Sequence, residues 1–136
     1  MNARGNGVER RVLQAVVSVL CIVPIGAGAA GVVLGPGLVG TDAPDADLDS
    51  HFRYLSGLLL AIGLTFLSTV PEIERRTRRF RLAAALVFCG GLARGLSLLA
   101  SGEPTLPHLV GLGLELIATP LLVLWQARLA GRPVAA

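Results

Sequence analysis

The stretch that decides the fold of this chain is LAAALVFCGGLARGLSLLASGEPTLPHLVGLGLELIATPLLVLWQ, residues 82–126. It consists of two apolar segments joined by a short turn rich in Gly and Pro, and each segment carries one interior charge, Arg94 in the first and Glu115 in the second. The two charges stand at nearly equal distances in sequence from the turn centre at Pro104 and Thr105. If both segments are helices with a rise of about 1.5 Å per residue and fold back on each other, the charges lie at the same depth.

The equal depth of the two charges matters because a lone Arg or carboxylate inside a bilayer costs about 2.5 to 3.5 kcal/mol, even on the lenient insertion scale. Two opposite charges at one depth relieve each other, so we predict that Arg94 and Glu115 form a pair. Two interpretations of this pair stay open. In the first it is a structural ion pair that fixes the register of two helices, and in the second it belongs to a ligand-binding site.

Composition places the whole chain in the same class. Hydrophobic residues make up 53% of its 136 residues and charged residues 15%, with a mean hydropathy of +0.69, whereas a soluble domain carries about a quarter charged residues. Four long apolar runs span residues 12–34, 52–70, 82–100 and 108–126. Each is close to the ~20 residues that cross hydrocarbon as a helix, and none alternates as a strand does. We predict an all-α membrane protein with four transmembrane helices in a single domain, residues 1–136.

The arginines predict the orientation of these helices. They gather before the first run (residues 4–11), between the second and third runs (residues 75–81), and after the last (Arg128 and Arg132). Because Arg and Lys concentrate in cytoplasmic segments, we predict an antiparallel bundle with both termini in the cytoplasm and the arginines against anionic lipid headgroups. The expected location is the bacterial inner membrane.

Several function classes are disfavoured. The net charge of +3 comes from arginines that flank apolar runs without aromatic residues between them, which argues against nucleic-acid binding. Cys21 and Cys89 lie inside apolar runs and are expected to be inert buried thiols, with a disulfide as the minor alternative. No metal-ligand spacing, phosphate-binding glycine loop or nucleophile–base constellation is present, so we predict no metal and no cofactor, and an enzyme is the less favoured class.

Two features of the first third of the chain allow alternatives. The first run resembles a secretory signal peptide, but its apolar character continues to Leu34, which favours an uncleaved span. In the acidic loop, residues 42–49, Asp45-x-Asp47-x-Asp49 is similar to the opening of a calcium loop, yet the required glycine and closing acid are replaced by serines. We therefore expect Asp47, Asp49 or Ser50 to cap the second helix instead of binding an ion.

Small residues at helical spacing predict where helices approach each other. The stripes are Gly26, Gly28, Gly31 and Gly35 in the first run, Tyr54, Gly57, Ala61, Thr65 and Ser68 in the second, and Gly90, Gly91 and Gly95 beside Arg94 in the third. In the fourth run we expect Pro120 to bend the helix next to Glu115 and Trp125 to mark the membrane interface.

Polar residues near the predicted outer ends of the helices form the candidate site. They are Arg94, Glu115, Tyr54, His51, Arg53 and His108. For the residues at the outer boundary, a simple interfacial role is the alternative to membership of the site. As one cluster, the six residues would bind a small amphipathic or anionic ligand that enters from the outer leaflet.

Four of these features together are similar to a known family: HFRYLSG at residues 51–57, the Arg-rich loop, GGLAR at residues 90–94, and Glu115. They resemble an uncharacterised bacterial family of small four-span membrane proteins, a domain of unknown function, over roughly Val12 to Leu129. The layout is similar to that of the DoxX-like four-helix membrane proteins, some of which associate with quinone-linked oxidoreductases. The resemblance implies the fold and the membrane location.

Three hypotheses about function follow. The favoured one is a small module that binds a lipid or another amphipathic ligand around Arg94 and Glu115. The second is an accessory subunit that stabilises a larger membrane complex, or a homo-oligomer. The third is a small integral-membrane enzyme that uses Glu115 or a histidine as acid and base, for which the substrate geometry is decisive.

Overall fold

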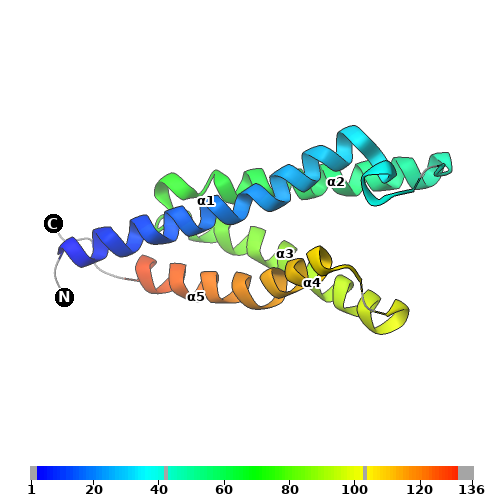
Figure 1. Cartoon of the computed structure of the whole chain (residues 1–136). Helices are drawn as coiled ribbons and strands as arrows, with labels where there is room; N and C mark the ends of the chain where they lie inside the picture. Colours follow the sequence, from blue (N-terminus) through cyan, green and yellow to red (C-terminus); the bar gives the residue numbers. More distant parts are fainter. Residues whose placement is uncertain (1–2, 42, 103, 132–136) are drawn as a thin grey trace.

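The computed structural model describes residues 3–41, 43–102 and 104–131. Its elements are α1 (Ala3–Leu34), η1 (Gly35–Val39), α2 (Ala46–Leu67), η2 (Val70–Glu72), α3 (Thr77–Ser101), α4 (Leu106–Gly113), η3 (Leu114–Ala118) and α5 (Thr119–Ala130), shown in Figure 1. No strand occurs among the described residues. Asp42 of the acidic loop, Glu103 of the predicted turn and Arg132 lie outside them.

Four stretches of helix are long and apolar enough to cross a membrane. They run over Gly7–Val39, Ala46–Glu72, Thr77–Ser101 and Leu106–Ala130. Each apolar run of the sequence lies inside one of them, and the first two stretches include the 3-10 turns η1 and η2 that follow α1 and α2. The predicted all-helical architecture with four membrane-length helices is confirmed.

The start of α2 shows how the acidic loop is used. Asp45 is the N-cap, and its side chain accepts a hydrogen bond from the backbone N–H of Leu48 at 2.7 Å. Asp47 and Asp49 follow in the first turn, where negative charge complements the helix dipole. An aspartate therefore caps the helix, but it stands earlier in the loop than the three residues that the sequence favoured.

Glycines hold α1 and α2 side by side along much of their length (Figure 1). A Cβ built on Gly28 would lie 2.6 Å from the backbone nitrogen of Leu60, and one on Gly31 would overlap Ser56. From the other side, a Cβ on Gly63 would meet Ile25 at 2.8 Å. The backbones approach this closely only because the side chains are missing. The prediction for the first run is confirmed at Gly28 and Gly31, whereas Gly26 faces open space.

The predicted stripe of α2 holds only in part, since Gly57 and Thr65 are half-buried and Tyr54, Ala61 and Ser68 are exposed. The buried residues of this helix are Ser56, Gly63 and Phe66, while Tyr54 is 63% exposed and Ser68 is also on the surface. Gly31 of α1 packs against Ser56, and Ile25 of α1 packs against Gly63. The face of α2 that contains Ser56 and Gly63 therefore lies against α1, and much of the predicted stripe is left on the surface. The hydroxyl of Ser68 donates to the carbonyl oxygen of Thr65 at 2.7 Å, so it needs no neighbouring helix.

The hydrophobic core lies at one end of the molecule, which we call the closed end. Its buried members are Leu13, Val17, Cys21, Phe66, Ile73, Phe80, Ala83, Ala84 and Leu129. All four membrane-length helices contribute, and the rings of Phe66 and Phe80 meet edge to face with centroids 5.1 Å apart. Packing at the closed end joins the α1–α2 pair to α3 and α5.

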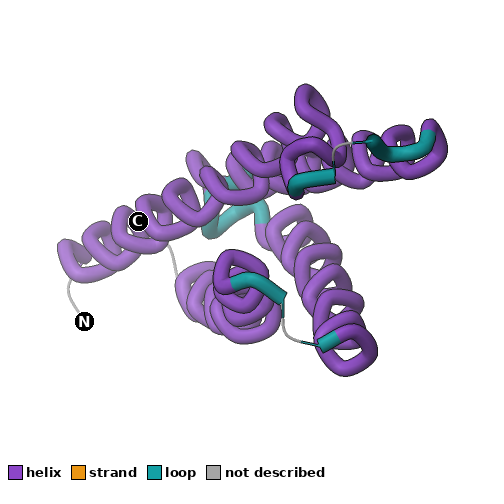
Figure 2. The backbone as a smooth tube through the Cα atoms, turned by 45° about the vertical axis from the view of Figure 1, so that its right-hand side comes forward, coloured by secondary structure: helices purple, strands orange, loops and turns teal. Residues whose placement is uncertain are grey.

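At the opposite end, the open end, the helices diverge. It contains η1, the start of α2, the end of α3 and the start of α4. Figures 1 and 2 show the α1–α2 pair separating there from α3 and α4, whereas the start of α1 and the end of α5 approach each other at the closed end. The bundle is therefore packed at one end and splayed at the other.

Candidate functional site

Arg94 of α3 and Glu115 of η3 form a bidentate ion pair. The Nε atom of Arg94 donates to Oε2 of Glu115 at 2.9 Å, and Nη2 donates to Oε1 at 3.1 Å. Their side chains are 33% and 17% exposed, respectively. Two parallel charge-assisted hydrogen bonds fix both the distance and the orientation of the groups. The pairing predicted from their spacing about the turn is confirmed.

Gly91 permits this contact between α3 and η3. A Cβ on Gly91 would lie 2.8 Å from Cβ of Glu115 and 2.8 Å from Cδ2 of Leu116. Gly95, by contrast, would make only an ordinary contact at 4.0 Å with Leu112, and nothing lies within 4 Å of a Cβ on Gly90. The predicted close approach is thus made at Gly91 alone, and Gly90 is on the exposed side of α3.

The helix that carries Glu115 changes its winding at that residue. Leu114–Ala118 form a π-helix, and the hydroxyl of Thr119 donates to the carbonyl oxygen of Leu114 at 2.9 Å. Pro120 follows and has no N–H with which to continue the regular ladder. The disturbance expected from Pro120 therefore takes the form of a wide turn around Glu115, a feature that is frequent at functional sites.

The pair lies at the boundary between the closed and open ends. On α3, Phe80, Ala83 and Val87 pack in or against the core. Arg94 continues their row at helical spacing, two turns beyond Val87, so it lies on the face of α3 that is directed into the bundle. Toward the open end the two helix pairs diverge (Figure 2).

Arg53 belongs to a different cluster. Its Nε atom donates to Oδ2 of Asp49 at 2.8 Å, and Nη1 donates to the carbonyl oxygens of Val32 at 2.6 Å and Val33 at 3.0 Å. These carbonyls stand at the end of α1, where the last turn of a helix lacks backbone partners. Arg53 therefore closes the corner between α1 and α2. Gly35, with φ of +61°, leaves room for this guanidinium.

The other three predicted residues are on the surface. His51 and Tyr54 are exposed on α2, and His108 is exposed at the start of α4, where Nδ1 of its ring lies 3.0 Å from Oγ1 of Thr105. The structure thus brings Arg94 and Glu115 together and places Tyr54, His51, Arg53 and His108 elsewhere. The half of α2 that carries His51, Arg53 and Tyr54 packs on α1, so these three residues lie apart from the pair. The ring of His108, at the start of α4, contacts Thr105.

A polar network at the closed end was not predicted from the sequence. The buried amide of Gln126 donates to the carbonyl oxygen of Ile73 and to Oγ1 of Thr77, both at 2.8 Å. Glu9 accepts hydrogen bonds from the indole of Trp125 at 3.1 Å and from Arg128. The position of an amide side chain at the end of an apolar run could have indicated that Gln126 is hydrogen-bonded. Its partners could not be identified from the sequence, because they are far away along the chain.

Metal and disulfide chemistry find no support in the part of the chain that is described. No group of three or more His, Cys, Asp or Glu residues there is arranged to hold a metal ion. Cys21 and Cys89 are free thiols, Cys21 in the core and Cys89 exposed on α3. The disulfide alternative is therefore wrong, and so is the expected burial of Cys89, because that residue points away from the neighbouring helices.

Comparison with known proteins gives one match. Residues 12–126 match the family model described as a domain of unknown function (DUF4345), a range that covers all four apolar runs. No curated protein and no solved structure matches the chain. Because the match extends over most of its length, the chain belongs to the DUF4345 family.

Proposed function

We propose that this integral membrane protein binds a membrane lipid, or a similar amphipathic molecule, at the Arg94–Glu115 pair. The observation that carries the proposal is the position of the pair, which lies beyond the core on the face of α3 that packs on η3 and keeps part of its surface uncovered. An intramembrane charge beside an opening is typical of a binding site.

The hydrogen-bonding capacity of Arg94 indicates the chemistry of the ligand. A guanidinium has five N–H donors, and Glu115 takes two of them. Since the pair as a whole is neutral, the remaining donors suit a polar group that accepts hydrogen bonds without requiring a full negative charge, such as an ester or quinone carbonyl or a phosphate oxygen. The ligand is therefore an amphipath with an acceptor-bearing head.

An apolar groove next to the pair suits the rest of such a molecule. It is lined by Leu92, Gly95, Leu96, Leu98, Leu99 and Leu116. Gly95 follows Arg94 and Leu116 follows Glu115 in sequence, which puts the groove at the same height along α3 and η3 as the ion pair. A ligand head at Arg94 would leave its hydrocarbon chain along these leucines.

The proposal includes an orientation in the bacterial cell membrane. We place the closed end on the cytoplasmic side, because the arginines of the η2–α3 segment and of the first and last helices gather there. The helices then cross antiparallel, in a layout similar to that of the DoxX-like proteins. Reporter fusions at Arg78 and Asp45 should read cytoplasmic and external, respectively, and a cytoplasmic result at Asp45 would reverse the assignment.

Photo-crosslinking tests the binding site directly. A phospholipid with a photoactivatable group in its acyl chain is reconstituted with the protein, and crosslinked peptides are mapped. We expect crosslinks at residues 92–99 and 116 that are lost in the double variant Arg94→Gln with Glu115→Gln, which leaves no unpaired charge. The matched control is Gly90→Ala, on the open side of the same helix. Equal crosslinking in all three proteins would show that the pair binds no lipid.

An accessory role in a larger complex is the second candidate. It is supported by the exposed leucines of the groove, among which Leu99 is 85% exposed, since a partner helix would cover them as well as a lipid does. Protein–protein crosslinks from position 99 in native membranes would favour this role, and lipid crosslinks from the same position would favour the binding module.

A further inference from the structure

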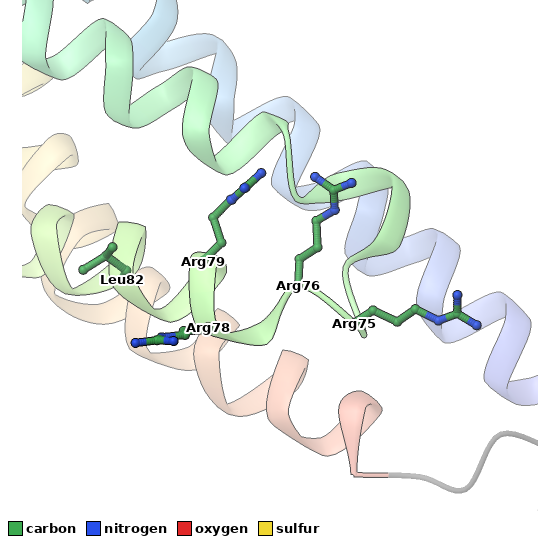
Figure 3. A pocket seen from close by; sticks show the side chains of 5 residues that line it. All are labelled: Arg75, Arg76, Arg78, Arg79 and Leu82. Atoms are coloured by element: carbon green, nitrogen blue, oxygen red, sulfur yellow. The ribbon is translucent and has the colours of Figure 1, made fainter.

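Four arginines surround a pocket at the closed end. Arg75, Arg76, Arg78 and Arg79 line it together with Leu82, at the segment between η2 and the first turns of α3 (Figure 3). In Figure 3 the side chains of Arg76 and Arg79 rise on the same side of this segment, while Arg78 lies along the outside of α3. The pocket is separate from the Arg94–Glu115 pair, which lies much further along α3.

The acids of this segment are already engaged. Glu72 pairs with Arg76 at 3.1 Å, and Glu74 pairs with Arg10 at 3.2 Å. Among the described residues, no acidic side chain lies within ion-pair distance of Arg75, Arg78 or Arg79. The pocket therefore keeps three positive charges that no acidic side chain of the described residues neutralises.

The start of α3 adds donors to the same place. Arg76 is its N-cap residue and provides no side-chain hydrogen bond to the first turn. The N–H groups of the first turn of a helix have no partner within the helix, and together with the helix dipole they favour an anion. The three unneutralised guanidinium groups stand around this helix end.

The position of Leu82 favours a lipid over a free anion as the ligand of this pocket. It lies one turn beyond Arg78 and Arg79, toward the apolar body of α3, and it is 62% exposed. Leu86 follows one turn later and is exposed as well. A free phosphate would use only the guanidinium groups, whereas a phospholipid would use both the guanidinium groups and the apolar wall below them.

We propose that this pocket binds the phosphate headgroup of an anionic membrane lipid, with an acyl chain along Leu82 and Leu86. Guanidinium groups hold phosphate oxygens through paired N–H donors, so the headgroup would bind on the side to which Arg79 points, while Arg75 and Arg78 add positive charge around it. Each arginine near an anionic membrane surface strengthens binding about fivefold. The site anchors the start of α3 at the level of the headgroups and does not depend on the ligand proposed at Arg94.

The test compares two double variants with the same change in charge. Arg78→Gln with Arg79→Gln removes two groups of the pocket, and Arg11→Gln with Arg81→Gln removes two exposed arginines outside it. The probe is phosphatidylglycerol at a low fraction in phosphatidylcholine nanodiscs, and native mass spectrometry measures its enrichment on the protein. We expect enrichment in the wild type, a loss of about 25-fold in the pocket variant, and a clearly smaller loss in the control, whose arginines act on the lipid only as general surface charge.

Two results would overturn the proposal. An equal loss in both double variants would show that the arginines act only as diffuse charge. Full competition by inorganic phosphate or glycerol phosphate at millimolar concentration would show that the site takes free phosphate and not a lipid. Circular dichroism of each variant verifies that it is folded, which we expect because all four arginines are exposed.

Discussion

The closed and open ends of this bundle differ in what covers their side chains. At the closed end, Leu13 and Phe80 are fully buried by protein, and the amide of Gln126 donates hydrogen bonds to Ile73 and Thr77. At the open end, leucines of α3 are exposed and the Arg94–Glu115 pair is only partly covered. In a membrane, an apolar side chain is stabilised about equally by contact with protein and by contact with lipid. Helices of a membrane bundle can therefore diverge where lipid occupies the space between them. The difference separates a part that holds the fold from a part suited to binding.

The largest effect is expected when one member of the ion pair is removed. Arg94→Ala leaves Glu115 without its partner, and Glu115→Ala does the reverse. At buried pairs such a loss costs about 3 to 5 kcal/mol, and partial exposure places this pair at the lower limit. Folded yield, measured by size-exclusion chromatography in mild detergent, should fall for both variants. Unchanged yield in both would mean that water or lipid headgroups solvate these charges fully.

A smaller effect is expected when the seam between α3 and η3 is overfilled. Gly91→Leu forces a side chain into the space of Glu115 and Leu116, which should cost about 1 to 3 kcal/mol in the free energy of unfolding. Gly95→Leu should cost less, because its Cβ would only touch Leu112. Gly90→Leu is the matched control on the open side of the helix. Equal melting temperatures for all three variants would place the seam elsewhere.

The closed end is probed by Gln126→Leu. This substitution removes the amide that donates to the carbonyl of Ile73 and to Thr77 and leaves a buried carbonyl without that donor. We expect a loss of about 1 to 2 kcal/mol, the usual cost of an unsatisfied buried polar group. Thermal unfolding in detergent measures it. Lipid crosslinking at residues 92–99 should remain, and its loss would show that the two ends are not independent.

The smallest effect is expected at the start of α2. Asp45→Ala removes the cap hydrogen bond to Leu48 and should cost about 1 kcal/mol. Asp47→Ala, which removes a charge from the first turn without removing a cap, is the control. Both are measured by thermal unfolding, and a larger loss for Asp47→Ala would contradict the assignment of the cap.

The elements and the ion pair were predictable from sequence because both depend on position along the chain. Four apolar runs determine four helices, and the symmetric placement of Arg94 and Glu115 about one turn determines their common depth. The seam was predictable only in part, because Gly90 and Gly91 are identical as residues and differ only in the side of α3 on which they lie.

The contacts between the helix pairs were not predictable. The face of α2 that packs on α1 contains Ser56 and Gly63, which are no smaller or less polar than Gly57 and Ala61 in the predicted stripe. The divergence of the two pairs has no sequence signal, since an apolar residue serves equally against lipid and against protein. The six predicted site residues were therefore assigned to one cluster, although only two of them meet.

A charge exchange tests most directly whether Arg94 and Glu115 are partners that hold a ligand. Arg94→Glu combined with Glu115→Arg keeps both charges at the same depth and keeps their attraction, whereas each single reversal places like charges side by side. Folded yield and lipid crosslinking are measured on the wild type, both single reversals and the exchange. We predict that the exchange recovers most of the yield that the single reversals lose, while crosslinking at residues 92–99 stays low because the donors of Arg94 now lie on η3. An exchanged protein that folds no better than the single reversals would contradict the partnership, and one that folds and crosslinks like the wild type would contradict the binding role.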